Sequence, residues 1–241
     1  MAQGRETHHG AEHPASARRP RLLGPGDVEP AAALLTRAFR DDPSKLALFP
    51  DEPERERVIA LAAPLRLRAA IPYGTAYAVE IDDALAGVAL WHPPNAKPSA
   101  VAPVATLLRA LFAPGRRAFP LVSHVARMLW RDRQALQRIA AGRTAVAREA
   151  RRRPTWYLAL LGTDPRFRGR GAARQLLEHV LKRCDEDGVA AWTEATNTGN
   201  VSMYERFGFV TVAHLRGGDA IPDLWLLRRE PQPGHAQEQE E

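Results

Sequence analysis

The chain of 241 residues is 45% hydrophobic, has a formal net charge of +6 and contains one cysteine. No run of about 18 apolar residues occurs, the start is polar rather than signal-like, and an intramolecular disulfide is excluded, so we expect a cytoplasmic protein without a membrane span. The positive charge does not by itself indicate nucleic-acid binding, because arginine supplies 31 of the 34 basic residues alongside abundant alanine, which suggests a compositional bias.

Both ends of the chain, residues 1–18 and 230–241, have the composition of disordered tails. His8, His9 and His13 in the first tail could chelate a metal, but they share no helical or strand frame, so no metal site is expected. We expect residues 19–229 to form a single domain, because the first strand and helix must complete the sheet that later segments use.

The first third of the domain predicts a strand, two helices and a hairpin. A short strand is expected at 20–23, followed by a helix that starts after an N-cap at Asp27 and ends near Arg40. Asp41-Asp42-Pro43 is expected to end that helix, although either aspartate could also meet a cationic substrate. The remaining expected elements are a helix at 52–70 and two strands, at 75–79 and 84–91, around the turn Asp82-Asp83.

Residues 98–153 predict a basic helical insertion, with twelve arginines against only Asp132 and Glu149. One interpretation is a cap that lines a wall of an acceptor site. The other is an amphipathic layer with a solvated basic face. An RNA-binding arm has neither a recognition signature nor interleaved aromatic residues in its favour. The core residues expected for such a layer are Leu107, Leu108, Leu111, Val125, Met128 and Leu129.

The following segments predict a strand, a tight turn and a helix. The continuous apolar run at 156–161 indicates a buried strand. Glycines at 169 and 171 then leave room for a ligand to approach the backbone at the start of a helix, where unpaired N–H groups favour phosphate. The apolar face expected for this helix consists of Leu176, Leu177, Val180, Leu181 and Cys184, with the cysteine as a small core residue.

The rest of the chain predicts a strand at 189–195, parallel to the strand at 156–161, and a short helix at 202–207. An antiparallel pair of strands at 210–215 and 223–228 is expected to end the domain. The elements together predict a mixed α/β fold.

Two common phosphate-binding loops do not fit the glycine turn. Gly169 and Gly171 lack the third small residue of a Rossmann fingerprint, because Arg174 occupies its position. A Walker loop is excluded because no Gly-Lys-Ser/Thr tripeptide occurs in the chain.

The segment Arg168-Gly-Arg-Gly-Ala-Ala173 instead resembles the pyrophosphate loop of the GNAT superfamily of N-acetyltransferases. A second segment, from Asn197 through Tyr204-Glu205 to Gly208-Phe209, is similar to a further signature of that superfamily, in the same order and spacing. Residues 153–158 and 38–43 also resemble a branch that includes puromycin N-acetyltransferase.

The resemblance implies acetyl-CoA as co-substrate and a central, partly splayed mixed sheet flanked by helices. It places the acetyl-pantetheine arm along Leu161, Gly162 and Thr163, where Gly162 either suits a distortion of the strand or simply ends it. Of Asn197 and Asn200, one is expected to bind the arm and the other to cap the next helix. The residues expected to bind acetyl-CoA are Leu161, Gly162, Thr163, Arg168, Gly169, Arg170, Gly171, Ala172, Ala173, Arg174, Asn197, Asn200 and Tyr204.

Two side chains are candidates for catalysis. The resemblance places the phenol of Tyr204 near the sulfur of CoA, as a general acid for the departing thiolate. Glu194 lies on a strand expected to be interior, where a carboxylate needs a partner or a function. It could act as general base, bind a substrate ammonium group, or form a salt bridge with one of the arginines.

The resulting hypothesis is acetyl transfer from acetyl-CoA to a primary amine of a small molecule in a ternary complex, by a monomer or homodimer. Acetylation of a protein lysine or N-terminus is an alternative within the same class. A non-catalytic acyl-CoA sensor would not need Tyr204, and a nucleic-acid partner is not expected.

Overall fold

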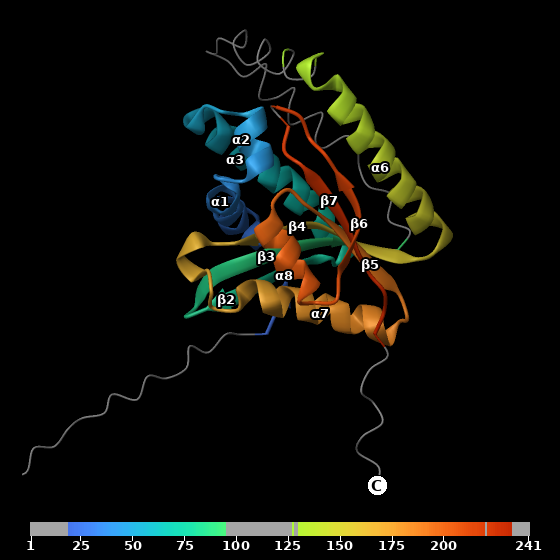
Figure 1. Ribbon diagram of the computed structural model, residues 1–241. Coiled ribbons are helices and arrows are strands. Elements are labelled where there is room, and N and C mark those ends of the chain that lie inside the picture. Colours follow the sequence, from blue (N-terminus) through green and yellow to red (C-terminus); the bar gives the residue numbers. More distant parts are fainter. Residues whose placement is uncertain (1–18, 95–126, 128–129, 220, 233–241) are drawn as a thin grey trace, which may run out of the picture.

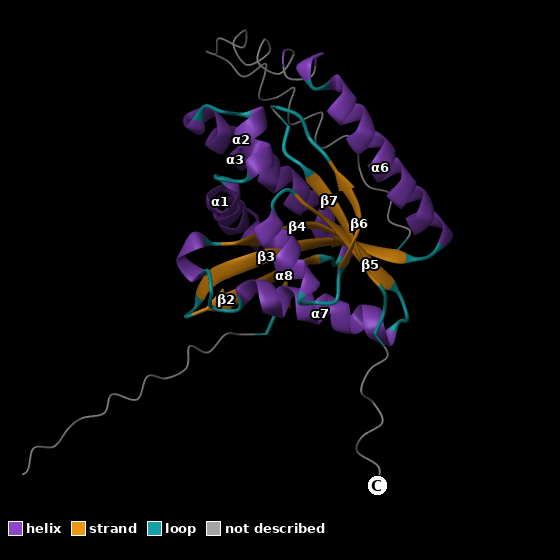
Figure 2. Cartoon of the chain, in the orientation of Figure 1, coloured by secondary structure: helices purple, strands orange, loops and turns teal. Residues whose placement is uncertain are grey.

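The structure is a computed structural model that describes residues 19–94, 127, 130–219 and 221–232. Its strands form a seven-stranded mixed sheet in the order β1-β2-β3-β4-β5-β7-β6, with helices on both faces (Figures 1 and 2). All neighbouring strands are antiparallel except β4 and β5, which are parallel as expected. The six leucine, valine and methionine residues expected as core of the insertion lie outside the described residues, as do the two predicted tails apart from 230–232.

The strands are β1 Arg21–Leu22, β2 Ala76–Ile81, β3 Ala84–His92, β4 Thr155–Thr163, β5 Ala190–Ala195, β6 Val210–Leu215 and β7 Leu224–Arg229. The α-helices are α1 Val28–Phe39, α2 Pro43–Leu48, α3 Glu52–Ala70, α6 Arg133–Arg152, α7 Ala172–Glu186 and α8 Thr198–Glu205. Three 3-10 turns are η1 Pro25–Asp27, η2 Ile71–Tyr73 and η3 Pro165–Phe167. The predicted helix at 52–70 and the predicted strand at 210–215 are confirmed to the residue, whereas the other predicted elements shift at one or both ends by a few positions.

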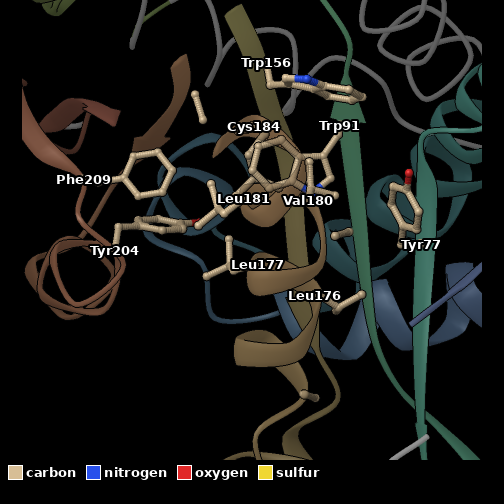
Figure 3. Packing of buried hydrophobic residues seen from close by; sticks show 14 of the residues in the cluster. Tyr77, Trp91, Trp156, Leu176, Leu177, Val180, Leu181, Cys184, Tyr204 and Phe209 are labelled. Atoms are coloured by element: carbon tan, nitrogen blue, oxygen red, sulfur yellow. The ribbon is translucent and has the colours of Figure 1, made fainter. Parts of the chain in front are cut away.

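Helix α7 covers one face of the sheet and buries its predicted apolar stripe there (Figure 3). Leu176, Leu177 and Cys184 are fully buried among residues from β2, β3 and β4. Burial raises the pKa of the Cys184 thiol to about 12, so the cysteine behaves as a small apolar core residue. Helices α1 and α3 cover the opposite face in a separate cluster that includes Leu34, Leu35 and strand residues from β2 to β4.

Helix α6 lies on the same face as α1 and α3, over the β7 and β6 end of the sheet (Figure 1). Its Ile139 clusters with Leu226 of β7, and Leu226 is the register partner of Glu194, so both point toward α6. Tyr157 of β4 stacks on Trp192 of β5, with ring centroids 4.0 Å apart. The residues on either side of Tyr157 pack toward α7, so Tyr157 itself points to the opposite face, the one that α6 covers.

The sheet splays between β4 and β5, as the family resemblance implies. These strands pair only where Thr155–Leu158 faces Ala190–Thr193, and the rest of β4 pairs with β3 alone. The pairing with β3 skips Ala159, which places a β-bulge at the point where the splay starts.

Gly162 does not serve either purpose expected from the sequence. It lies inside β4 in regular register with Val88, so it neither forms the distortion nor ends the strand. A Cβ at this position would approach Leu35 Cδ2 of α1 to 2.7 Å. The glycine is therefore needed because α1 packs directly on the strand.

Three local predictions were wrong for identifiable reasons. Helix α8 starts at Thr198 rather than Ser202, because the Asn197 side chain accepts a hydrogen bond from the N–H of Asn200 and caps the helix there. Asp27 is not a side-chain cap of α1; it accepts from the N–H of Gly24 and from Arg21 instead. The segment after Asp42 forms the unexpected helix α2, which Asp42 caps.

Candidate active site

The turn between β4 and α7 leaves several backbone N–H groups free for a ligand. Gly169 and Gly171 have φ values of 78° and 85°, the left-handed region that favours glycine. No atom lies within 4 Å of a Cβ built on either residue, so the space above them is open. Gly171 caps α7, whose first N–H groups have no partner within the helix and carry the positive end of its dipole. This geometry suits a pyrophosphate.

A buried carboxylate that the sequence analysis missed holds this turn in place. Asp164 follows β4, is 0% exposed, and accepts hydrogen bonds from the backbone N–H and the guanidinium of Arg166. It also accepts from Nε of Arg37 on α1, at 3.0 Å. The Arg166 and Arg37 partners hold the pKa of Asp164 well below its usual range. A Thr-Asp-Pro sequence after a strand looks like an ordinary turn, and nothing in it signals the arginine on a distant helix.

A groove of about 990 Å³ runs over the turn and collects most of the predicted cofactor residues. Arg170 is the exception, because its guanidinium forms an ion pair with Asp82 at 2.8 Å and lies over the ring of Phe167. The predicted residues that line the groove are Leu161, Gly162, Thr163, Arg168, Gly169, Gly171, Ala172, Ala173, Arg174, Asn197, Asn200 and Tyr204.

A second cavity, of about 510 Å³, lies on the α1, α3 and α6 face beside the splay of β4 and β5. Its walls come from α1, α2, α3, α6 and α8 as well as from the strands, and they include Tyr157 and Glu194. The groove and this cavity share Phe39, Asp42, Leu161, Asn200 and Tyr204. A compound in one would therefore meet a compound in the other at these residues.

The carboxylate of Glu194 is held in an ion pair at the wall of the second cavity. Nε of Arg143 on α6 lies 3.0 and 3.1 Å from its two oxygens, and Nη2 of the same arginine also donates to it. The Glu194 side chain is 14% exposed, so the carboxylate faces the cavity from a largely buried position on the interior strand. Of the three alternatives weighed from the sequence, the salt bridge is therefore present, and it leaves the carboxylate at the cavity wall.

Tyr204 lies where the two cavities meet and is 6% exposed. Its ring packs against Phe209, with centroids 5.6 Å apart (Figure 3). Burial raises the pKa of the phenol to about 12, against the opposing effect of a hydrogen bond with Thr193. The Thr193 hydroxyl in turn donates to the carbonyl of Leu158, at 3.1 Å. The phenol therefore carries its proton at neutral pH.

Asn197 and Asn200 have different positions and contacts in the structure. Asn197 uses its side-chain oxygen to cap α8, at 2.8 Å from the N–H of Asn200. Asn200 is exposed and lines both the groove and the cavity. Asn200 is thus the asparagine whose amide is placed to meet a ligand.

Nothing in the sequence indicates that two cationic residues of the cavity wall belong to the site. Arg66 comes from α3 and Lys45 from the unexpected helix α2. Burial lowers the pKa of Lys45, and the nearby charges of Arg66 and Arg143 lower it further, against the opposing effect of Asp42. Arg66 lies in a helix that was predicted without a functional role and Lys45 in a segment without a predicted element, so only the fold brings them to the cavity.

Among the described residues, no helix is long and apolar enough to cross a membrane, and no group of three or more His, Cys, Asp or Glu side chains could hold a metal ion.

The splayed sheet, the glycine turn and the adjoining cavity describe the fold of acyl-CoA-dependent N-acyltransferases. The sequence model of the acetyltransferase (GNAT) family matches residues 34–209, most of the chain, so this chain belongs to that family.

Two similar proteins match part of the chain. An uncharacterized N-acetyltransferase of Schizosaccharomyces pombe is 32% identical over 88 residues, which are 35% of each protein. A mycothiol acetyltransferase of Propionibacterium freudenreichii is 41% identical over 64 residues, 25% of this chain and 20% of that protein. The chain thus covers about a third or less of the length of these relatives.

A solved structure covers nearly the whole fold. The crystal structure of a histone acetyltransferase HPA2 and related acetyltransferase from Corynebacterium glutamicum has a TM-score of 0.60 and 19% identity, over 90% of this chain and 98% of that one. At this identity the likeness concerns the fold alone.

Proposed function

We propose that the protein transfers an acetyl group from acetyl-CoA to a primary amine of a small molecule, by direct attack in a ternary complex. The observation that carries this proposal is the junction of the groove and the cavity at Leu161, Asn200 and Tyr204. Direct transfer requires the thioester and the amine to be held in contact, and a shared wall between two binding spaces provides that arrangement.

The groove fits acetyl-CoA by its donors and its open space. The N–H groups at Gly171 and the first turn of α7 bind the pyrophosphate, with the side chains of Arg168 and Arg174 as further partners. Within the described part of the chain, the edge of β4 from Leu161 to Thr163 has no strand partner on the β5 side, and it pairs with the pantetheine arm. When bound, acetyl-CoA supplies an activated acetyl thioester at the end of that arm.

The residues at the junction orient the amine and supply a proton. Tyr204 keeps its proton at neutral pH and donates it to the sulfur as the thiolate leaves. Glu194, fixed by Arg143, accepts hydrogen bonds from the amine, positions it and takes up through water the proton that the nitrogen loses as the amide forms. Helix α6 contributes Arg143 to the wall, and in this proposal it forms the cap expected from the basic insertion.

The size of the cavity favours a small acceptor. Its volume of about 510 Å³ lies within the range of about 300 to 1,000 Å³ that is typical of small-molecule sites. Kinship with the puromycin N-acetyltransferase-like branch rests on the segments at 38–43 and 153–158 and on Tyr204–Phe209.

A thiol-release assay with acetyl-CoA tests the proposal. The acceptor panel contains aminonucleosides, aminoglycosides, polyamines, amino acids and lysine peptides, and calorimetry measures acetyl-CoA binding in parallel. We expect tight acetyl-CoA binding and amine-dependent thiol release with at least one small amine. Release with lysine peptides alone would favour a protein acetyltransferase. Binding without release from any acceptor would favour a sensor, and absence of both would overturn the proposal.

A further inference from the structure

The wall of the second cavity carries more positive than negative charge. Three cationic side chains line it, Lys45, Arg66 and Arg143, against the two carboxylates of Asp42 and Glu194. The cations lie close enough together that Arg66 and Arg143 both lower the pKa of Lys45, in addition to the effect of burial. The side of the cavity formed by α2 and α3 is therefore a region of positive potential.

Both carboxylates already have partners in the protein. The Asp42 side chain caps α2 by accepting from the N–H groups of Ser44 and Lys45, at 3.0 and 3.2 Å. It also accepts from the hydroxyl of Ser44. Glu194 is held by the guanidinium of Arg143 through both of its oxygens. Neither acid neutralises Arg66.

Arg66 and Lys45 are the cations left for a ligand. In the described ranges of the chain, Arg66 has no hydrogen bond or ion pair, although other arginines of the protein do. The only recorded hydrogen bond of Lys45 Nζ goes to the hydroxyl of Ser44, at 3.3 Å, again within the described residues. Lys45 is only partly exposed, and an ammonium group held against the wall of a cavity benefits from a counter-ion.

Much of the rest of the wall is apolar, although Ser44, Thr193, Thr196 and Asn200 also line it. Leu48, Phe49, Val58 and Ile59 line it from α2, α3 and the segment between them, and Tyr157 lines it from β4. A ligand that fills the cavity therefore needs a hydrocarbon or aromatic body as well as groups that match the charges at its ends.

We propose that the acceptor is an amino-acid-like compound, a primary amine that also carries a free carboxylate, and that Arg66 binds this carboxylate with Lys45 beside it. The inference rests on the proposed function and names its substrate class. The amine lies at Glu194 and Tyr204, the apolar body lies along Tyr157, and the acid lies at the α3 end. An arginine fork matches a carboxylate in two parallel hydrogen bonds, which gives both affinity and orientation.

Matched acceptors test the charge requirement in the thiol-release assay. One set is phenylalanine, phenylalaninamide and phenethylamine. A second set is 6-aminohexanoate, 6-aminohexanamide and hexylamine, with an aminoalkyl phosphonate added to separate carboxylate from phosphate-type acids. In at least one set we expect kcat/KM for the carboxylate to exceed that of its uncharged partners by about 10- to 100-fold, the usual effect of a hydrogen bond to a charged group.

Variants of two arginines on the same helix separate binding by Arg66 from general effects. Arg66→Met should raise KM for the carboxylate by about 10- to 100-fold and leave KM for the matched amine unchanged. Arg57→Met removes an exposed arginine of α3 outside the cavity and should change neither value. Three results would overturn the inference and leave the proposed function standing. The first is equal rates for acid, amide and amine, and the second is a preference for polyamines or the phosphonate. The third is an equal loss of kcat/KM with every acceptor in Arg66→Met.

If acetyl-CoA binds but no amine of the panel is acetylated, direct binding decides the question. Calorimetry with CoA present then measures 3-phenylpropanoate and hexanoate, which keep the body and the acid but lack the amine. Binding that is lost in Arg66→Met and kept in Arg57→Met supports the inference, and absence of Arg66-dependent binding overturns it. The proposed function itself is judged separately, by acetyl-CoA binding and thiol release in the wild-type protein and not by the dependence on Arg66.

Discussion

The groove and the cavity that meet at Tyr204 are built in opposite ways. The phosphate-binding part of the groove uses backbone groups from one continuous stretch, between Thr163 and Arg174, and needs mainly small residues there, although residues at 38–43 and 197–207 also line the groove. The cavity uses side chains from five helices and three strands, spread along the chain from Leu35 to Leu224. A backbone site constrains the local sequence strongly, whereas a side-chain site can be assembled from many sequences. The first is therefore readable as a motif, and the second is visible only in the fold.

The largest effect is expected from a change in the backbone site. Gly171→Val should lower acetyl-CoA affinity by at least about 100-fold, because the new side chain occupies the space over the N–H groups that the pyrophosphate needs. The measurement is calorimetry with acetyl-CoA.

A second glycine controls for strain in the Gly171 variant. Gly188 also has a positive φ, 64°, and open space around its Cβ position, but it follows α7 at the other end. Gly188→Val should show a similar loss of stability, about 1 to 2 kcal/mol, with acetyl-CoA affinity intact. If the two variants bind acetyl-CoA equally well, the turn does not hold the pyrophosphate.

At the junction, Tyr204→Phe should reduce turnover by about 10- to 1000-fold at saturating acetyl-CoA and acceptor, because it removes the proton offered to the thiolate. Acetyl-CoA affinity should change little, since the ring and its packing on Phe209 remain. The lost hydrogen bond with Thr193 should cost about 1 kcal/mol of stability, measured by thermal unfolding.

Tyr77→Phe is the matched control, because Tyr77 is also 6% exposed and belongs to the same core cluster, but lines neither cavity. It should retain full turnover. A Tyr204→Phe enzyme that is as fast as Tyr77→Phe would exclude the role of the phenol as general acid.

Asp164, which holds the turn beneath the groove, should make the stability of the protein depend on pH. Asp164→Asn should cost roughly 1 to 3 kcal/mol at neutral pH, because it weakens the charged hydrogen bonds that the partly exposed Arg166 and Arg37 donate to a buried carboxylate. The pKa of Asp164 is lowered in the folded protein, so its contribution is present above the unfolded value of about 3.9 and is lost as pH falls below it toward the folded value. The difference between wild type and variant in urea unfolding should therefore shrink below about pH 4.

Asp187→Asn provides the exposed counterpart, since Asp187 pairs with Arg183 on the surface of α7 at 3.5 Å. That change should cost less than about 0.5 kcal/mol at any pH. An Asp164 variant that behaves like the Asp187 variant would show that the buried pair does not support the turn.

The same contrast explains how far the sequence could be read. The helix at 52–70, the Asp82-Asp83 turn, the parallel strands and the apolar face of α7 follow local patterns, and all are confirmed. Gly162 was misinterpreted because its neighbour Leu35 is distant in sequence. Asn197 and Asp42 were capping residues whose partners are local, so a closer reading of cap spacing could have found α2 and the true start of α8.

The side-chain site could not be assembled from patterns. Glu194 was noticed because a charge on an interior strand is unusual, but its partner Arg143 was one of twelve arginines in the basic insertion. Lys45 and Arg66 had no unusual context at all until helices α2 and α3 placed them on one wall. Long-range pairs of common residues leave no periodic or spacing signal in a single sequence.

The smallest expected effect on turnover is that of a change at Glu194, and this change tests the side-chain site most directly. Glu194→Gln keeps the shape of the side chain and removes the charge, so it should lower turnover by about 10-fold and leave acetyl-CoA affinity unchanged. Arg143 loses its ion-pair partner in this variant, which would lower stability even if Glu194 had no contact with the amine. Glu80→Gln gives a partial comparison, because Glu80 is a strand carboxylate paired with Arg21 and 19% exposed, outside both cavities, although Arg21 keeps Asp27 as a second partner. A turnover loss in Glu194→Gln alone would support the amine contact, whereas wild-type turnover of Glu194→Gln from about pH 6 to 9 would reduce the residue to a structural partner of Arg143.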